Sequence, residues 1–167
     1  MEREKLESAL EALHPASFGW ALSCCHRDRE EAEEVLQMSY LKIMEGKARF
    51  DGRSSFKTWL FAVIRYTALE RFRWQRVRQM LFVETWSPPR PDQILERSER
   101  TRQLMRALLT ISTRQREVLE LVFYHDMTIE EASQTLGISL GSARTHYQRG
   151  KQRLLTILNE EDRVAFA

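Results

Sequence analysis

Residues 128–151 read Thr-Ile-Glu-Glu-Ala-Ser-Gln-Thr-Leu-Gly-Ile-Ser-Leu-Gly-Ser-Ala-Arg-Thr-His-Tyr-Gln-Arg-Gly-Lys, and this stretch decides the fold. Thr128 and Glu131 have the spacing of a capping box, in which two side chains satisfy free N–H groups at a helix start. Gly137 can adopt the positive φ that ends a helix, and Ser139 is a suitable N-cap for the next helix. The pattern predicts a helix-turn-helix.

The second helix of this motif would carry polar and basic side chains on its outer face. They are Arg144, Thr145, Gln148, Arg149 and Lys151. Such a helix suits the major groove of DNA, where arginine pairs with guanine and glutamine with adenine. An ordinary helical hairpin with a solvated charged face is the alternative, because lookalikes of this motif are common.

The composition limits the class of protein. The 167 residues suffice for one domain or two small ones, and 43% of them are hydrophobic. The net charge is only +2, but glutamates gather over 30–34 and arginines over 65–78. Segregated charge of this kind indicates two surfaces with two different partners.

The sequence favours a cytoplasmic protein. No apolar run has the length of a transmembrane helix, and the charged N-terminus leads into no apolar signal segment. Cys24 and Cys25 are adjacent, so a disulfide between them would be strained. We expect one thiol to pack in a helix and the other to be partly exposed. Together with His26 they are too few for a usual zinc site, and we expect neither a metal nor a cofactor.

A proline-rich stretch divides the chain into two helical halves. It is Trp86-Ser-Pro-Pro-Arg-Pro91, and proline prevents a helix from continuing. We therefore expect a domain over 1–79, a linker over 80–95 and a second domain over 96–167. Strand alternation is absent, so the predicted fold is all-α, with two small helical domains.

Apolar residues at helical spacing predict the individual helices. The helices before the helix-turn-helix are expected near 14–25, 28–46, 55–79, 92–109 and 113–124, with a loop over 47–54. Pro15 would lie near the start of the first major helix, where proline is tolerated. Ser112 and Gln115 form a second possible capping box.

The two halves together resemble an extracytoplasmic-function (ECF) sigma factor, a compact member of the sigma-70 family. The acidic segment 31–43 looks like region 2.2, the segment 50–78 looks like regions 2.3 and 2.4, and 112–119 opens what looks like region 4. Both motif sets have the family's order and spacing. The resemblance implies a non-enzymatic subunit that binds core RNA polymerase and directs promoter recognition and transcription initiation.

The resemblance implies that the helix over 31–43 contacts the clamp helices of the polymerase β′ subunit. The candidate contacts are Glu31, Glu34, Gln37 and Lys42. An acidic helix that meets a basic surface would fix orientation and speed association. Met38 stands where the family often has an acid, so we expect a more apolar or weaker contact there. Contacts with the polymerase β flap and with an anti-sigma factor are also implied.

For the −10 promoter element, the resemblance implies a loop that accepts an unstacked base and a basic helix that follows the phosphates. The candidates are Arg49, Arg53, Ser54, Ser55, Lys57, Trp59, Arg65, Tyr66, Arg71, Arg73 and Arg76, with Arg78 as a further phosphate contact. Trp59 is either a wedge between the strands or a core residue. Tyr66 falls where the family commonly has Asn, so we expect a different −10 preference. Glu70 replaces a frequent Asp, which is a mild change.

For the −35 element, the resemblance implies the outer face of the helix-turn-helix, with each side chain contacting a base or a phosphate. His146 would pack or touch the DNA backbone. Two other classes are a stand-alone helix-turn-helix regulator and a sigma-mimicking adaptor. The acidic and arginine-rich helices argue against the first, and the basic DNA faces argue against the second. We find no phosphate-binding loop, catalytic triad or metal-ligand cluster that would indicate an enzyme.

Overall fold

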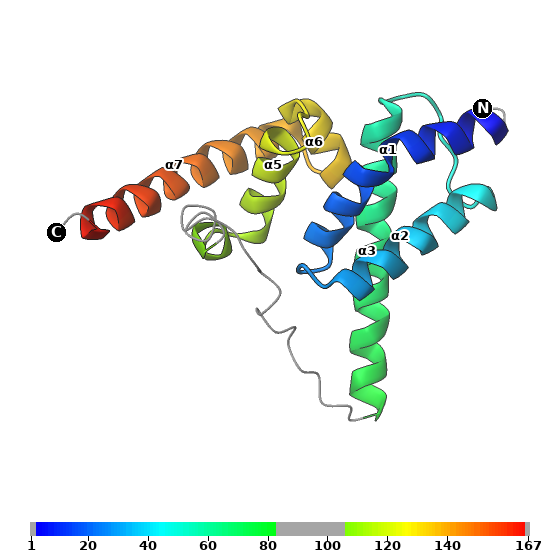
Figure 1. The fold of residues 1–167 in the computed structure, drawn as a ribbon, viewed down its shortest axis with the longest axis horizontal. Helices are drawn as coiled ribbons and strands as arrows, with labels where there is room; N and C mark the ends of the chain where they lie inside the picture. Colours follow the sequence, from blue (N-terminus) through cyan, green and yellow to red (C-terminus); the bar gives the residue numbers. More distant parts are fainter. Residues whose placement is uncertain (1–2, 83–105, 166–167) are drawn as a thin grey trace. The chain divides into compact units, whose positions relative to one another are not determined.

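The computed structural model describes residues 3–82 and 106–165, and every regular element within those ranges is a helix (Figure 1). The chain divides into two compact units, Met1–Pro89 and Arg90–Ala167. The predicted all-α fold with two small helical domains is confirmed. None of the described helices is long and apolar enough to cross a bilayer.

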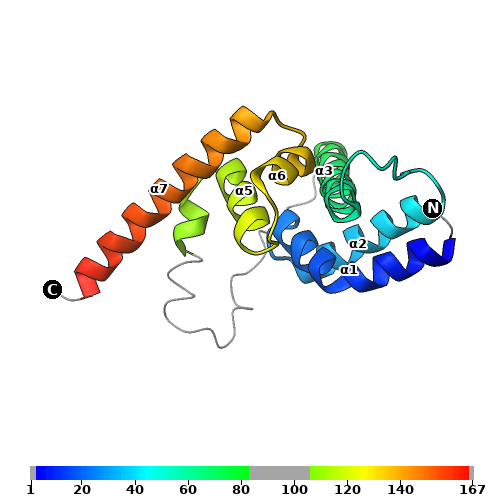
Figure 2. The same ribbon diagram turned by 90° about the horizontal axis from the view of Figure 1, so that it is seen from above.

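Within residues 3–82, the N-terminal unit consists of three helices, and each packs on the other two. They are α1 (Arg3–Cys24), α2 (Arg29–Met44) and α3 (Phe56–Phe82). In Figures 1 and 2, α1 and α2 run side by side and cross α3, and Figure 1 shows that the C-terminal end of α3 continues beyond both of them. The N-terminal part of α3 is thus packed against α1 and α2, and its C-terminal end is not covered by them.

A tryptophan from α1 lies at the centre of this unit. Trp20 is fully buried, and its indole Nε1 donates a hydrogen bond of 3.0 Å to the backbone oxygen of Phe61 on α3. The two rings are nearly parallel, with centroids 5.9 Å apart. Val35 of α2 and Ile64 of α3 are also fully buried. All three helices therefore contribute to one core.

The position of Pro15 was predicted wrongly. The proline lies inside α1, because this helix begins at Arg3 and not near residue 14. A proline in a helix interior removes one backbone hydrogen bond. Leu10 and Ser17, on either side of it, are both buried. Tertiary packing on both sides thus holds the helix through the proline, as it commonly outweighs local propensity.

The other helices of the N-terminal unit were predicted closely. The segment expected at 28–46 forms α2, and the one expected at 55–79 forms α3, which continues to Phe82. Much of the expected linker lies outside the described residues, and so does the part of the expected helix 92–109 that precedes residue 106. The domain limits and the linker over 80–95 therefore stay predictions.

The C-terminal unit contains α5 (Thr113–Phe123), α6 (Ile129–Leu136) and α7 (Leu140–Ala165), after a helical segment over 106–110. Both predicted capping boxes are confirmed, at the starts of α5 and α6. Gly137 ends α6 with a φ of 63°. The predicted helix-turn-helix is therefore present, formed by α6 and the first half of α7.

Gly150 marks the closest approach of α7 to α5. The residue is buried, and a Cβ at this position would lie 3.0 Å from the Cδ1 of Leu119 and 3.1 Å from the Cβ of Gln115. Only a residue without a side chain fits such a crossing without moving its neighbours. Gly150 therefore fixes which face of α7 turns inward and, as a result, which face remains outside.

Candidate binding surfaces of the two units

The N-terminus of α2 is capped and acidic. Asp28 is the N-cap, and its carboxylate accepts a hydrogen bond of 3.0 Å from the backbone N–H of Glu31. Negative side chains in the first turn, here Glu30 and Glu31, interact favourably with the positive end of the helix dipole. Local charge therefore favours a helix start close to the predicted position, residue 28.

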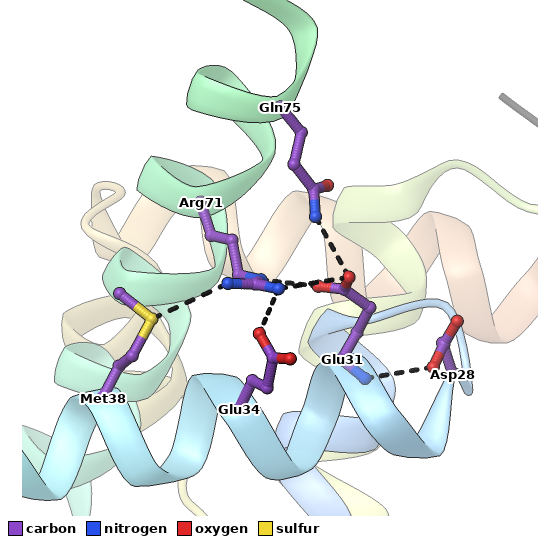
Figure 3. A network of polar contacts seen from close by, with 6 residues as sticks. All are labelled: Asp28, Glu31, Glu34, Met38, Arg71 and Gln75. Carbon is purple, nitrogen blue, oxygen red and sulfur yellow. Dashed lines mark hydrogen bonds and ion pairs between the residues drawn. The ribbon is translucent and has the colours of Figure 1, made fainter. Parts of the chain in front are cut away.

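Four side chains join α2 to α3 in a polar network that we call the clasp, made of Glu31, Glu34, Arg71 and Gln75 (Figure 3). Arg71 Nε donates to Glu31 Oε2 at 2.6 Å, and Nη2 donates to Glu31 Oε1 at 3.3 Å. Nη2 also forms an ion pair with Glu34. Gln75 Nε2 donates to Glu31 Oε1 at 3.0 Å. Glu31 therefore faces α3.

The clasp lowers the pKa of Glu31. The hydrogen bond from Arg71 is the largest cause, and the positive charge of Arg71 and the hydrogen bond from Gln75 act in the same direction. Partial burial opposes them by raising the pKa. The carboxylate side chain is 26% exposed and the guanidinium side chain 24%, so water screens this pair less than an ordinary surface pair.

We expect the clasp to make the N-terminal unit sensitive to acid. Because the folded pKa of Glu31 is lowered, its stabilising contribution is complete above the ordinary glutamate pKa and is lost as pH falls through the lowered value. Glu31→Gln should make the free energy of unfolding depend less on pH in this range. The measurement is urea unfolding between about pH 3 and pH 7. Glu33→Gln is the matched control, since Glu33 pairs with the exposed Arg29 of its own helix. If both changes reduced the pH dependence equally, the acid sensitivity would not come from the clasp.

The outward face of α2 is polar at one end and apolar at the other. Gln37 is exposed. Leu41 is 58% exposed, and Met38 and Met44 are each 37% exposed. Lys42 turns instead toward α3, where its Nζ forms an ion pair with Glu70. Of the four predicted polymerase contacts, Gln37 is on the open surface, and Glu34 is exposed although it pairs with Arg71. Glu31 and Lys42 are turned toward α3.

Three aromatic rings anchor the loop between α2 and α3. The centroids of Phe50, Phe56 and Trp59 lie 5.3 to 5.4 Å from one another. Trp59 is half-buried and packs in this cluster, which agrees with the core alternative. The cluster ties the middle of this loop, at Phe50, to the first turn of α3, and the loop carries the exposed Arg49 and Arg53.

Several loop residues already have partners within the unit. The Ser55 Oγ accepts a hydrogen bond of 3.1 Å from the backbone N–H of Thr58, so the hydroxyl caps α3. Arg53 Nε lies 3.2 Å from Asp51 Oδ2. Ser54 is half-buried, and Lys57 places its Nζ over the ring of Phe61 at 5.8 Å. The loop is therefore ordered by local contacts before any partner binds.

The exposed side of α3 interleaves aromatic and basic side chains. Tyr66 and Trp74 are 70% and 64% exposed, and Arg73 and Arg76 are exposed as well. Arg65, another predicted phosphate contact, does not share this exposure. It is only 9% exposed, because it shares the inward face of α3 with buried apolar residues one turn away. The side chain of Arg78 lies outside the part of the chain that the structure describes.

Trp74 was missed by the sequence reasoning, although a signal for it exists. It lies between two arginines in the run Arg73-Trp-Gln-Arg76. An aromatic ring among cations suits unpaired nucleic-acid bases, and this composition is the signal. Tyr66 and Trp74 are eight positions apart on one helix, or roughly 12 Å along its axis.

The C-terminal unit presents the predicted outer face of α7. All five residues of that face are exposed: Arg144, Thr145, Gln148, Arg149 and Lys151. Ala143 and Gly150 are buried on the opposite side. Lys151 lies at the margin of the face, with its Nζ over the ring of Tyr147 at 5.5 Å. His146 is half-buried.

The two cysteines differ in exposure as predicted, although the buried thiol lies just after the end of α1 and not in the helix. Cys25 is buried and Cys24 is half-buried. Burial, followed by the negative charges of Glu31 and Asp28, raises the pKa of the Cys25 thiol to about 12, so this thiol is inert as a nucleophile. No three metal-ligating side chains gather anywhere in the described part of the chain.

Two family descriptions match the chain. Sigma-70 region 2 matches residues 9–78, and sigma-70 region 4 matches residues 101–154. The chain belongs to the sigma-70 family. Region 2 of this sigma factor corresponds to most of the N-terminal unit, including the clasp and the basic helix. Region 4 contains the helix-turn-helix.

Known proteins define its type. The sigma factor is 29% identical over 147 residues to the ECF RNA polymerase sigma factor SigX of Bacillus subtilis, covering 81% of this chain and 76% of SigX. It is 26% identical over 144 residues to the RNA polymerase sigma factor YlaC of the same organism, covering 81% and 83%. In fold it resembles the sigma factor RpoE of Bartonella quintana, solved in complex with the anti-sigma factor NepR, with a TM-score of 0.74, 21% identity and coverage of 93% and 98%.

The predicted ECF type is thus confirmed, and with it the predicted function. This sigma factor binds core RNA polymerase and directs promoter recognition and transcription initiation. It is not an enzyme in its own right, since sigma factors are initiation subunits without a catalytic site.

Proposed function

We propose that this sigma factor docks on the β′ clamp helices of core RNA polymerase through the outward face of α2. The observation that carries the proposal is an open apolar stripe on an acidic helix, with Leu41 at its centre and Met38 and Met44 beside it. Interfaces commonly combine an apolar centre with a polar rim, and Glu34 and Gln37 supply such a rim. Methionine adapts its shape to a partner more readily than branched residues do.

The −10 element is bound, on this proposal, by the loop before α3 and by the exposed side of α3. Bases of an opened strand stack on Tyr66 and Trp74, and the phosphates follow Arg73 and Arg76. Tyr66 offers a ring in place of the amide common in the family, so it selects by stacking and not by hydrogen bonds to a base edge. The exposed Arg49 and Arg53 supply further cations at the loop.

The −35 element is bound by the outer face of α7, with Arg144 and Gln148 as the base-reading residues. The C-terminal unit also contacts the polymerase β flap. An anti-sigma factor controls the protein by covering these surfaces, and the bound NepR of the similar RpoE supports this part of the proposal. The protein acts in the cytoplasm, where its polymerase and its promoters are found.

The docking proposal is tested by measuring the affinity of the full-length protein for purified core polymerase. Leu41→Ala should weaken binding by about tenfold, which is a modest hot-spot effect. Leu69→Ala is the matched control, because Leu69 is a similarly exposed leucine, 46% exposed, on α3 of the same unit. Circular dichroism checks that both variants remain folded. An unchanged affinity for Leu41→Ala would overturn the docking face.

A further inference from the structure

The clasp connects the helix that faces the polymerase with the helix that faces the DNA. Arg71 comes from the middle of α3, and both carboxylates that hold it come from the first half of α2. The guanidinium also places Nη1 3.9 Å from the sulfur of Met38, on the outward face of α2 (Figure 3). Few of its hydrogen-bonding directions therefore remain for a phosphate.

A second bridge of opposite polarity lies beside the clasp. Lys42 of α2 pairs with Glu70 of α3, and its Nζ also lies 3.3 Å from Thr67 Oγ1. The carboxylates of α2 thus meet a cation on α3, and the cation of α2 meets a carboxylate on α3. A displacement of α2 along α3 would bring like charges together. Two bridges of opposite sign specify one register, as paired charges do between helices of a coiled coil.

The energetic role of such a bridge is positional. A partly buried ion pair adds little net stability, because removing the charges from water offsets much of their attraction. Its geometry is nevertheless specific, since the planar guanidinium binds a carboxylate through two directed hydrogen bonds. Arg71 is thus better suited to fixing the angle and register of two helices than to strengthening the fold.

We propose that Arg71 is a positioning residue and not a phosphate contact. It holds α2 in one register on α3, so that docking of α2 on the polymerase sets the position of the stacking side chains of α3 on the −10 strand. The inference rests on the proposed function of these two helices. It removes one residue from the predicted DNA-binding set and gives it a role in coupling polymerase binding to promoter opening.

The test compares Arg71→Ala, Glu31→Ala and Arg76→Ala in full-length protein, assembled with saturating core polymerase. The promoter is a fragment selected for transcription by the wild-type holoenzyme. Open-complex formation is followed with a fluorescent base in the −10 strand, and promoter binding is measured over a range of salt concentrations. Core affinity and urea unfolding are measured for each variant, so that loss of the fold or of docking is recognised separately.

The positioning role predicts equal effects from both sides of the clasp. Arg71→Ala and Glu31→Ala should each slow opening by about tenfold, and the double variant should be no slower than the worse single variant. Neither should change the salt dependence of promoter binding. Arg76→Ala, which removes an exposed cation, should lower the salt slope by about 0.7 to 0.9. A normal opening rate for Glu31→Ala, or a reduced salt slope for Arg71→Ala, would overturn the proposal.

A charge swap gives the decisive variant. Glu31→Arg is combined with Arg71→Glu, and Glu34→Gln is added so that no carboxylate faces the new glutamate. The positioning role predicts that the swap recovers most of the opening rate lost in Arg71→Ala. A phosphate contact predicts the opposite, because the swap places a negative charge on the DNA-facing helix. If Leu41→Ala keeps its affinity for core polymerase, the proposed docking face fails, whereas Arg71→Ala, Glu31→Ala and the swap still decide the inference.

Discussion

Replacing Trp20 with alanine should lower the free energy of unfolding of the N-terminal unit by about 3–5 kcal/mol, the usual cost of removing a large buried aromatic side chain. The indole is fully buried, stacks on Phe61 and donates a hydrogen bond to its backbone oxygen. Because a domain of this size is stable by only about 5–15 kcal/mol, a large share of its stability would be lost. Binding of core polymerase should weaken in proportion to the unfolded fraction.

The measurement uses the distribution of tryptophan in the chain. All four tryptophans precede residue 90, so their fluorescence reports the N-terminal unit, and circular dichroism reports both units. Trp20→Phe is the control, since it retains a ring and removes the hydrogen bond, with an expected loss of about 1 kcal/mol from that bond. A Trp20→Ala protein that unfolds at the wild-type urea concentration would show that this residue is not central to the core.

The helix-turn-helix could be predicted from the sequence because its determinants are local. Each capping box needs two residues three positions apart, and Gly137 ends α6 by its own conformational freedom. The outer face of α7 follows from the helical period alone. These features depend on neighbours in the chain, so a pattern in the sequence is sufficient to find them.

The clasp could not be predicted in the same way, because its partners are 40 residues apart in the sequence. Nothing local distinguishes Glu31 from Glu33. Glu31 nevertheless pairs with Arg71 of α3, whereas Glu33 pairs with Arg29 of its own helix. Arg65 is a similar case, since it falls outside the apolar stripe that the helical period predicts for α3, and its burial comes from tertiary packing. Charge alone suggested a phosphate contact there.

Replacing Arg144 or Gln148 with alanine should change which −35 sequences the holoenzyme accepts. Both side chains are exposed on the outer face of α7, and the helix is held by Gly150 and Ala143 on its buried side. A good bidentate contact with a base discriminates against the wrong base by about 1–3 kcal/mol, and alanine removes that discrimination at one position. Arg73 is the matched control on α3, because an exposed cation without base-edge geometry contributes equally to all sequences.

The measurement is transcription by reconstituted holoenzyme from a promoter library randomised at the −35 element, at two salt concentrations. Arg144→Ala and Gln148→Ala should relax the preference at one or two positions by about 10- to 100-fold while leaving the others intact. Arg73→Ala should lower transcription from all sequences and reduce its salt dependence, because fewer counterions are released. A uniform loss without any shift in preferred sequence would mean that Arg144 and Gln148 contact phosphates or support the fold. Tight sequence-specific binding of duplex DNA by the free protein would instead indicate that α7 can act without the polymerase, and that the division of labour between the two units is incorrect.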